Sequence, residues 1–256
     1  MNIIHCNPKT AGHSKGFSLF ADSGFLLRTF AAFMILVVCF VLASGWGIGV
    51  DNAYAGTVEV WVSTGSDDAE ESASGSVGLT SSDLELVRTS SNQQIGMRFQ
   101  NVSIEQGAII NSAYIEFSCD ENWHTETTNL TIYGQAHNNA LTFSGVNNNI
   151  SHRVKTNASV AWKITAQWDT THGKYQTPDL APLIQEIVDR SGWETGNSLV
   201  IIVTGTGKRV AESYNGGGAD LAPRLFIDYT GGDDKVSTCR IYYRDNKQAQ
   251  ADSTNN

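Results

Sequence analysis

Apolar and polar residues alternate along much of the chain beyond residue 56. In residues 57–62, Val58, Val60 and Val62 share one face, and Glu59 and Trp61 lie on the other. This period of two predicts a half-buried β-strand. By similar reasoning we predict strands at residues 77–80, 84–88, 95–99, 109–118, 130–136, 159–164, 209–214 and 224–229.

Residues 198–204 (SLVIIVT) differ because they are apolar on both faces. A strand of this kind is buried on both sides, so we expect it in the middle of a sheet. Residues 205–208 (GTGK) follow it. A phosphate-binding loop would need a glycine in place of Ile202 and a helix after Lys208, so a β-hairpin turn is favoured.

One stretch has the period of an amphipathic helix. Its apolar stripe consists of Leu180, Leu183, Ile184, Ile187 and Val188. The spacing of three and four residues places them on one face. We expect Thr177 to be the N-cap, Pro178 to take the first helical position and Gly192 to follow the C-terminus.

The predicted strands are short and spaced about ten residues apart, and a single short helix accompanies them. This pattern favours an all-β fold. We predict an antiparallel β-sandwich over residues 56–230, which are enough for one buried core. The Asn-rich connection at residues 137–157 is long for a compact domain, and such loops are often functional or locally structured.

The N-terminal region carries a targeting signal. Residues 30–43 are uncharged and mostly apolar, Arg28 precedes them, and Ala53-Tyr54-Ala55 follows as an A-x-A site. We predict a signal peptide over residues 1–55 with cleavage after Ala55, and a protein that is secreted or at the cell surface, extracellular or periplasmic. The apolar run is short for a stable membrane span, although an uncleaved anchor is the alternative.

The residues after the predicted sandwich are polar and lack an apolar period. Residues 231–256 are therefore predicted to be a disordered tail or linker. Removal of residues 1–55 leaves two cysteines, Cys119 and Cys239, which could pair in an oxidising compartment or stay free. No C-x-x-C sequence is present, which excludes a zinc ribbon or a thioredoxin-like site.

The chain is acidic. Residues 56–256 hold 14 basic and 24 acidic residues, a net charge near −10. This balance argues against a nucleic-acid partner. Four carboxylates lie close together as Asp67, Asp68, Glu70 and Glu71. They are our candidate ligands for calcium, which takes oxygen ligands, and the alternative is a solvated acidic loop.

Aromatic residues in polar surroundings predict a sugar-binding site. Sugar rings stack their C–H faces on aromatic rings, and nearby polar groups bind the hydroxyls. The candidate residues are Trp123, His124, Trp168, Asp169 and Tyr175. The alternative for each tryptophan is packing in the core, which we expect of Trp162 and Trp193.

Several short motifs occur in a familiar order. They are residues 95–99 (IGMRF), 107–115 (GAIINSAYI), 184–188 (IQEIV), 196–199 (GNSL), 211–213 (AES) and 223–229 (PRLFIDY). This order resembles the DNRLRE-type modules of bacterial surface and secreted proteins, which are similar to carbohydrate-binding modules. The resemblance covers residues 57–229 and implies a jelly-roll form of the sandwich and a glycan ligand. The Asn-rich connection and the acidic segment at 65–75 depart from the commoner pattern.

No catalytic motif is present: the sequence has neither H-E-x-x-H nor G-x-S-x-G. Glu212 alternates with Val210 and Tyr214, so we expect it to be partly buried and paired with Arg98 or Arg209. We therefore predict a non-catalytic module that binds polysaccharide or a cell-surface glycan. The alternatives are a structural or adhesive surface module without a glycan ligand, and a polysaccharide hydrolase or lyase that uses two of the acidic residues.

Overall fold

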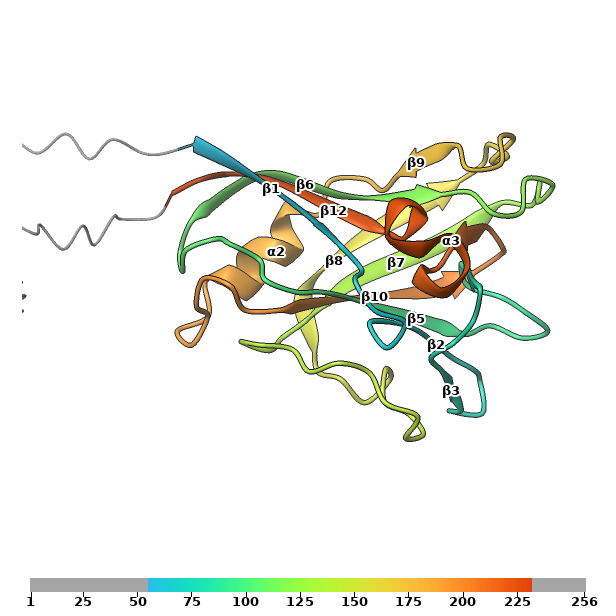
Figure 1. Cartoon of the computed structure of the whole chain (residues 1–256), viewed down its shortest axis with the longest axis horizontal. Helices are drawn as coiled ribbons and strands as arrows, with labels where there is room; N and C mark the ends of the chain where they lie inside the picture. Colours follow the sequence, from blue (N-terminus) through green and yellow to red (C-terminus); the bar gives the residue numbers. More distant parts are fainter. Residues whose placement is uncertain (1–54, 232–256) are drawn as a thin grey trace, which may run out of the picture. The chain divides into compact units, whose positions relative to one another are not determined.

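The computed structural model describes residues 55–231 (Figure 1). The predicted signal peptide, the predicted tail and the pairing of Cys119 with Cys239 involve residues outside this range, and these predictions stay untested. Within the described range, no helix is long and apolar enough to cross a membrane. Cys119 is fully buried and its thiol lies 3.9 Å from the carbonyl oxygen of Trp168.

Two antiparallel sheets face each other. The four-stranded sheet has the order β1 (Ala55–Trp61), β12 (Arg224–Thr230), β6 (Ile109–Ser118) and β9 (Lys174–Gln176). The six-stranded sheet has the order β3 (Val77–Gly78), β2 (Asp68–Glu71), β5 (Gln94–Phe99), β10 (Leu199–Thr206), β7 (Thr128–Gln135) and β8 (Lys155–Ile164). A separate pair joins β11 (Val210–Glu212) to β4 (Asp83–Glu85).

The connections between the principal strands follow the jelly-roll order. The first strand, β1, pairs with the last, β12, over their whole length, from Ala55 opposite Thr230 to Trp61 opposite Arg224. The strands β5, β10, β7 and β8 lie side by side in the other sheet. This arrangement is that of a double-sheet jelly roll. The predicted antiparallel sandwich is therefore confirmed.

The core lies between the sheets, where the predicted inward residues meet. Ile95, Met97 and Phe99 of β5 are fully buried, and Ile115 and Phe117 of β6 are buried opposite them. Because each strand alternates, one face of every sheet supplies this core. Burial of such a side chain stabilises the fold by about 1.5–3 kcal/mol.

Helix α2 (Ala181–Val188) packs against β6, β7 and β8, and its predicted apolar stripe is buried. Its predicted start is wrong. The backbone of Thr177 donates to Ile115, and the Thr177 hydroxyl accepts from the backbone nitrogen of Ile115, so this residue extends the β9–β6 pairing. Pro182 takes the early helical position expected of Pro178, and the helix ends before Gly192.

The prediction of a central strand at 198–204 is confirmed, since β10 lies between β5 and β7. The Asn-rich connection covers its outer face. Ala140, Phe143 and Ile150 of this connection form a second small core with Val200, Ile202 and Ala69. A Cβ atom at Gly96 would lie 2.4 Å from the Phe143 ring, so only glycine allows this close approach.

A second helix, α3 (Tyr214–Leu221), was not predicted. Its three consecutive glycines have low helix propensity, and it is kinked at Gly218, which has a φ of 64°. The Ser213 side chain caps it by accepting from the backbone nitrogen of Gly216. The hairpin prediction for residues 205–208 is also wrong, because β11 pairs with β4 and not with β10.

Candidate functional site

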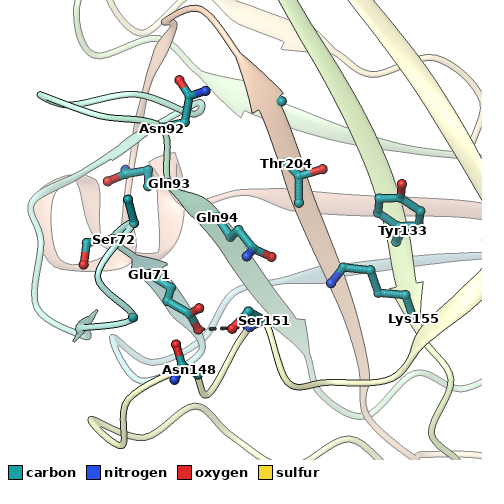
Figure 2. Close-up of a pocket in the computed structure, with 13 residues that line it drawn as sticks. Glu71, Ser72, Asn92, Gln93, Gln94, Tyr133, Asn148, Ser151, Lys155 and Thr204 are labelled. Atoms are coloured by element: carbon teal, nitrogen blue, oxygen red, sulfur yellow. Dashed lines mark hydrogen bonds between the residues drawn. The ribbon is translucent and has the colours of Figure 1, made fainter.

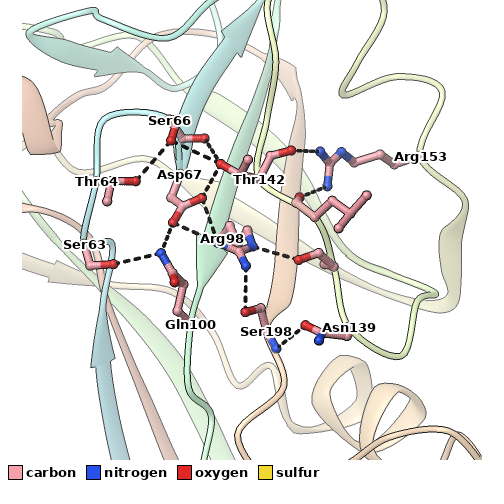
Figure 3. A network of polar contacts seen from close by, with 12 residues as sticks. Ser63, Thr64, Ser66, Asp67, Arg98, Gln100, Asn139, Thr142, Arg153 and Ser198 are labelled. Carbon is pink, nitrogen blue, oxygen red and sulfur yellow. Dashed lines mark hydrogen bonds and ion pairs between the residues drawn. The ribbon is translucent and has the colours of Figure 1, made fainter.

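Three of the four predicted calcium ligands lie in a strand. Asp68–Glu71 form β2, and Asp67, Asp68 and Glu71 are buried. The Asp67 carboxylate forms an ion pair with Arg98, whose Nη1 lies 3.1 Å from both carboxylate oxygens (Figure 3). Arg98 also donates to the Ala140 carbonyl and the Ser198 hydroxyl. This network ties β2 and β5 to the Asn-rich connection and to β10.

The other three carboxylates bind different partners. Asp68 accepts from the Tyr214 backbone nitrogen at 2.7 Å, and burial raises its pKa to about 6. Glu70 accepts from the Gln93 amide, and its pKa is raised to about 8 by burial and by Glu85.

Glu71 accepts from the backbone nitrogens of Ile150 and Ser151, at 2.6 and 2.9 Å. The alternative of a solvated loop is wrong, because each of the four carboxylates accepts a hydrogen bond from an internal donor. Among residues 55–231, no group of three or more acidic, histidine or cysteine side chains could hold a metal ion. Calcium binding stays a prediction, which a calcium titration of the melting temperature would test.

The predicted aromatic site is only partly assembled. Trp168 is 2% exposed and packs against Phe117 and Trp162, with ring centroids 6.2 Å from each. Tyr175 stacks on Trp168 at 4.7 Å and donates to Asp169 at 3.0 Å. The expectation that Trp168 presents a free ring is therefore wrong, since Tyr175 covers it on one side and the core on the other.

Trp123 is the exposed aromatic residue of this predicted set, at 62%. Its neighbour His124 is held by Glu121 at 2.6 Å. The loop that carries Trp123 contacts the loop that carries Asp169, through a hydrogen bond from the Asn122 side chain to the Asp169 carbonyl. The structure therefore brings the predicted residues to one end of the sandwich but offers one free ring there. Trp162 and Trp193 are buried, as predicted.

The predicted partner of Glu212 is wrong. Glu212 is buried and lies 3.1 Å from His172. Arg98 is engaged by Asp67, and the fully buried Arg209 donates to the carbonyl oxygens of residues 126, 166 and 208. Burial raises the pKa of the Glu212 carboxyl, and the nearby Asp120 adds to this.

A polar pocket of about 590 Å³ lies on the outer face of the six-stranded sheet (Figure 2). Its floor is made by outward side chains of four adjacent strands: Gln94 of β5, Thr204 of β10, Tyr133 of β7 and Lys155 of β8. Its walls are formed by residues 71–75 and 148–151, together with Asn92 and Gln93. The Glu71 bonds to Ile150 and Ser151 hold these walls together.

The floor of this pocket has polar groups without protein partners. The Gln94 Oε1 atom has no hydrogen-bond partner within residues 55–231. The Lys155 ammonium lies 5.9 Å from the Tyr133 ring centre, and no carboxylate in the described part of the chain forms an ion pair with it. Buried polar groups are normally paired, so the unpaired and buried Gln94 oxygen is unusual, and the partly exposed Lys155 ammonium is available to a bound molecule.

The sequence carries little signal for this pocket. Its floor residues come from four strands that are far apart along the chain, and each is only the polar member of an alternating pair. The clue available was the Asn-rich connection, which supplies one wall. A search with family models and a search of curated proteins found no match to this chain. The resemblance to DNRLRE-type modules stays a prediction.

Proposed function

We propose that this protein is a secreted or cell-surface module that binds a segment of polysaccharide or cell-surface glycan in the polar pocket, without catalysing a reaction. The observation that carries the proposal is the pocket floor. Amide, hydroxyl, ammonium and phenol groups converge there from four adjacent strands. Hydroxyl-rich ligands need this mixture of donors and acceptors.

The shape of the pocket supports the same ligand class. A volume of about 590 Å³ falls in the usual range for small-molecule sites and has room for a few sugar rings. The half-buried Tyr133 ring offers an apolar surface against which a sugar ring can stack. The Gln94 carbonyl is buried and lacks a protein donor, and it would accept from a ligand hydroxyl once its side chain turns towards the pocket.

Binding is better supported than hydrolysis. Glycoside hydrolysis normally uses two carboxyl groups on either side of the scissile bond. The residues that line this pocket include one carboxylate, Glu71, and its Oε2 atom already accepts two backbone hydrogen bonds. That carboxylate holds the wall in place and is poorly placed for acid–base chemistry.

The test is a glycan array followed by titration calorimetry on the purified secreted chain. We expect at least one glycan to bind, and Tyr133→Ala or Gln94→Ala to weaken binding about tenfold or more. Trp123→Ala is the matched control, because it removes an exposed ring outside the pocket. Binding that is lost in Trp123→Ala and retained in Tyr133→Ala would move the site to the aromatic end. Absence of binding to any glycan would favour the structural or adhesive module.

A further inference from the structure

A second pocket lies on the other side of the sandwich. It has a volume of about 450 Å³ and is bordered by the ends of β1 and β12, by β9 and by helix α3. The side chains that matter are Trp61, Glu116, Lys174, Tyr214, Asp220 and Arg224. They belong to the outer face of the four-stranded sheet and to α3, so this pocket is distinct from the first.

The wall of this pocket is a fixed aromatic surface. Trp61 is 38% exposed and lies opposite Arg224 in the strand register. The Arg224 guanidinium lies 5.4 Å from the Trp61 ring centre and 4.1 Å from that of Phe226. Glu116 holds this guanidinium at 2.8 Å. A ring fixed in this way loses little conformational entropy when a ligand stacks on it.

Free polar groups face the same space. Within residues 55–231, the Trp61 indole N–H, the Tyr214 hydroxyl and the Asp220 carboxylate make no hydrogen bond. Helix α3 carries Tyr214 and Asp220, and the Tyr214 backbone nitrogen is fixed by Asp68 at 2.7 Å. The Lys174 ammonium donates to the Ser118 hydroxyl and has no acidic partner in the described residues.

We propose that this pocket binds one neutral sugar ring, stacked on Trp61. The charged groups of the lining balance, with Glu116 and Asp220 against Lys174 and Arg224, so the pocket as a whole favours neither an anion nor a cation. A carboxylate can accept from two neighbouring hydroxyls, and an ammonium can donate to a third oxygen. The stacking surface and these groups together fit a neutral hexose unit.

This inference extends the proposed function from one site to two. The first pocket opens on the outer face of the six-stranded sheet and the second on the outer face of the four-stranded sheet. These faces point away from each other, so one molecule would hold two glycan segments at once. The module would then link polysaccharide chains, and attachment to both would strengthen retention through effective concentration.

The experiment is titration calorimetry of the secreted chain with cellohexaose, xylohexaose, mannohexaose and chitohexaose. We expect two sites per molecule for at least one of these neutral probes, and one remaining site in Tyr133→Ala. In that background, Trp61→Ala should weaken binding about tenfold or more, and Asp220→Asn several-fold. Asp220→Asn changes an exposed residue and keeps its size, so it tests the site even if Trp61→Ala unfolds the edge of the sheet. Trp123→Ala should change nothing.

The outcomes separate the two proposals. If Tyr133→Ala binds like the wild type and Trp61→Ala abolishes binding, the first pocket is not a glycan site and the second is. If Tyr133→Ala binds none of the neutral probes, or if Trp61→Ala and Asp220→Asn both keep wild-type binding and stoichiometry, the second site is overturned. Turbidity of the protein with a soluble glucan or mannan adds a direct readout, because linking needs both sites. Tyr133→Ala and Trp61→Ala should each lower the turbidity, and Trp123→Ala should leave it unchanged.

Discussion

The outer faces of the two sheets differ in what covers them. On the six-stranded sheet, the Asn-rich connection lays Phe143 and Ile150 over β10 and forms a third layer. On the four-stranded sheet, no described segment packs a comparable apolar cluster. There, Tyr114 and Phe226 stack at 4.8 Å, and Arg224 lies over Phe226 and Trp61. One face therefore contributes to stability, whereas the other keeps aromatic rings near solvent.

The largest expected effect comes from the third layer. Phe143→Ala removes a side chain that is 2% exposed and leaves a cavity over Gly96. We expect a loss of about 3–5 kcal/mol in the free energy of unfolding, measured by urea denaturation. Phe226→Ala on the other sheet is the matched control and should lose about half as much, because that ring is only partly buried. Equal losses would contradict the contrast between the two faces.

The next effect concerns the ion pair that anchors this layer. Asp67→Ala leaves Arg98 largely buried, at 15% side-chain exposure, without a countercharge. Removal of one partner of a buried pair is strongly destabilising, and we expect a loss of about 3 kcal/mol by urea denaturation. Arg98→Met combined with Asp67→Leu should recover part of this loss, because it removes both charges together. If the double variant is no more stable than Asp67→Ala, the hydrogen bonds of this network contribute more to stability than its charges.

A smaller effect should appear as pH dependence in the six-stranded sheet. The folded state raises the pKa of Glu70 from 4.5 to about 8, so it binds this proton more tightly than the unfolded chain does. The resulting stability is present at low pH and is lost as pH rises towards about 8. The pKa of Asp68 is raised from 3.8 to about 6, so this carboxyl lowers stability in the same direction between those two pH values. Urea denaturation between about pH 6 and pH 8, the part of the Glu70 window that lies above the pKa of Asp68, should show a decline in stability.

Two variants separate the causes of this decline. Glu70→Gln cannot ionise, so its stability should change less with pH over the same window. Glu59→Gln on the four-stranded sheet should keep the wild-type decline. An unchanged decline in Glu70→Gln would assign the pH dependence to other groups.

The smallest effect belongs to the exposed charges of the four-stranded sheet. Glu59 lies 3.5 Å from Arg224 and is 44% exposed. Exposed pairs contribute little, so Glu59→Gln should change the free energy of unfolding by less than about 0.5 kcal/mol. The measurement is the same urea titration at low salt. A loss near that of Asp67→Ala would show that the two faces do not differ electrostatically.

Local pattern was enough to predict much of the fold. Alternation located β1, β5, β6 and β12, and the apolar run located the central strand β10. Errors arose where a distant partner decides the conformation. Thr177 looks like a helix cap but exchanges hydrogen bonds with Ile115, and Asp67 looks exposed but is buried against Arg98, 31 residues away. Helix α3 was not predicted because its glycines have low helix propensity and its sequence has no apolar stripe with helical spacing.

The candidate sites were harder to predict than the fold. Trp168 and Tyr175 are close in sequence and are in contact, but they stack on each other, so this face of each ring is not open to a ligand. The floor of the first pocket gathers Gln94, Tyr133 and Thr204 from strands that become neighbours only through the jelly-roll order. A single sequence does not reveal which polar members of alternating strands share a surface, because that depends on register between distant segments.

The pairing of the first strand with the last has a mechanical consequence. Ala55 and Thr230 are opposite each other at one end of the β1–β12 ladder. A pulling force applied through these two residues acts across the strands, so it loads the backbone hydrogen bonds one pair at a time instead of all together. The domain should therefore open like a zipper from this end, at lower force than a sandwich whose terminal strands are sheared lengthwise.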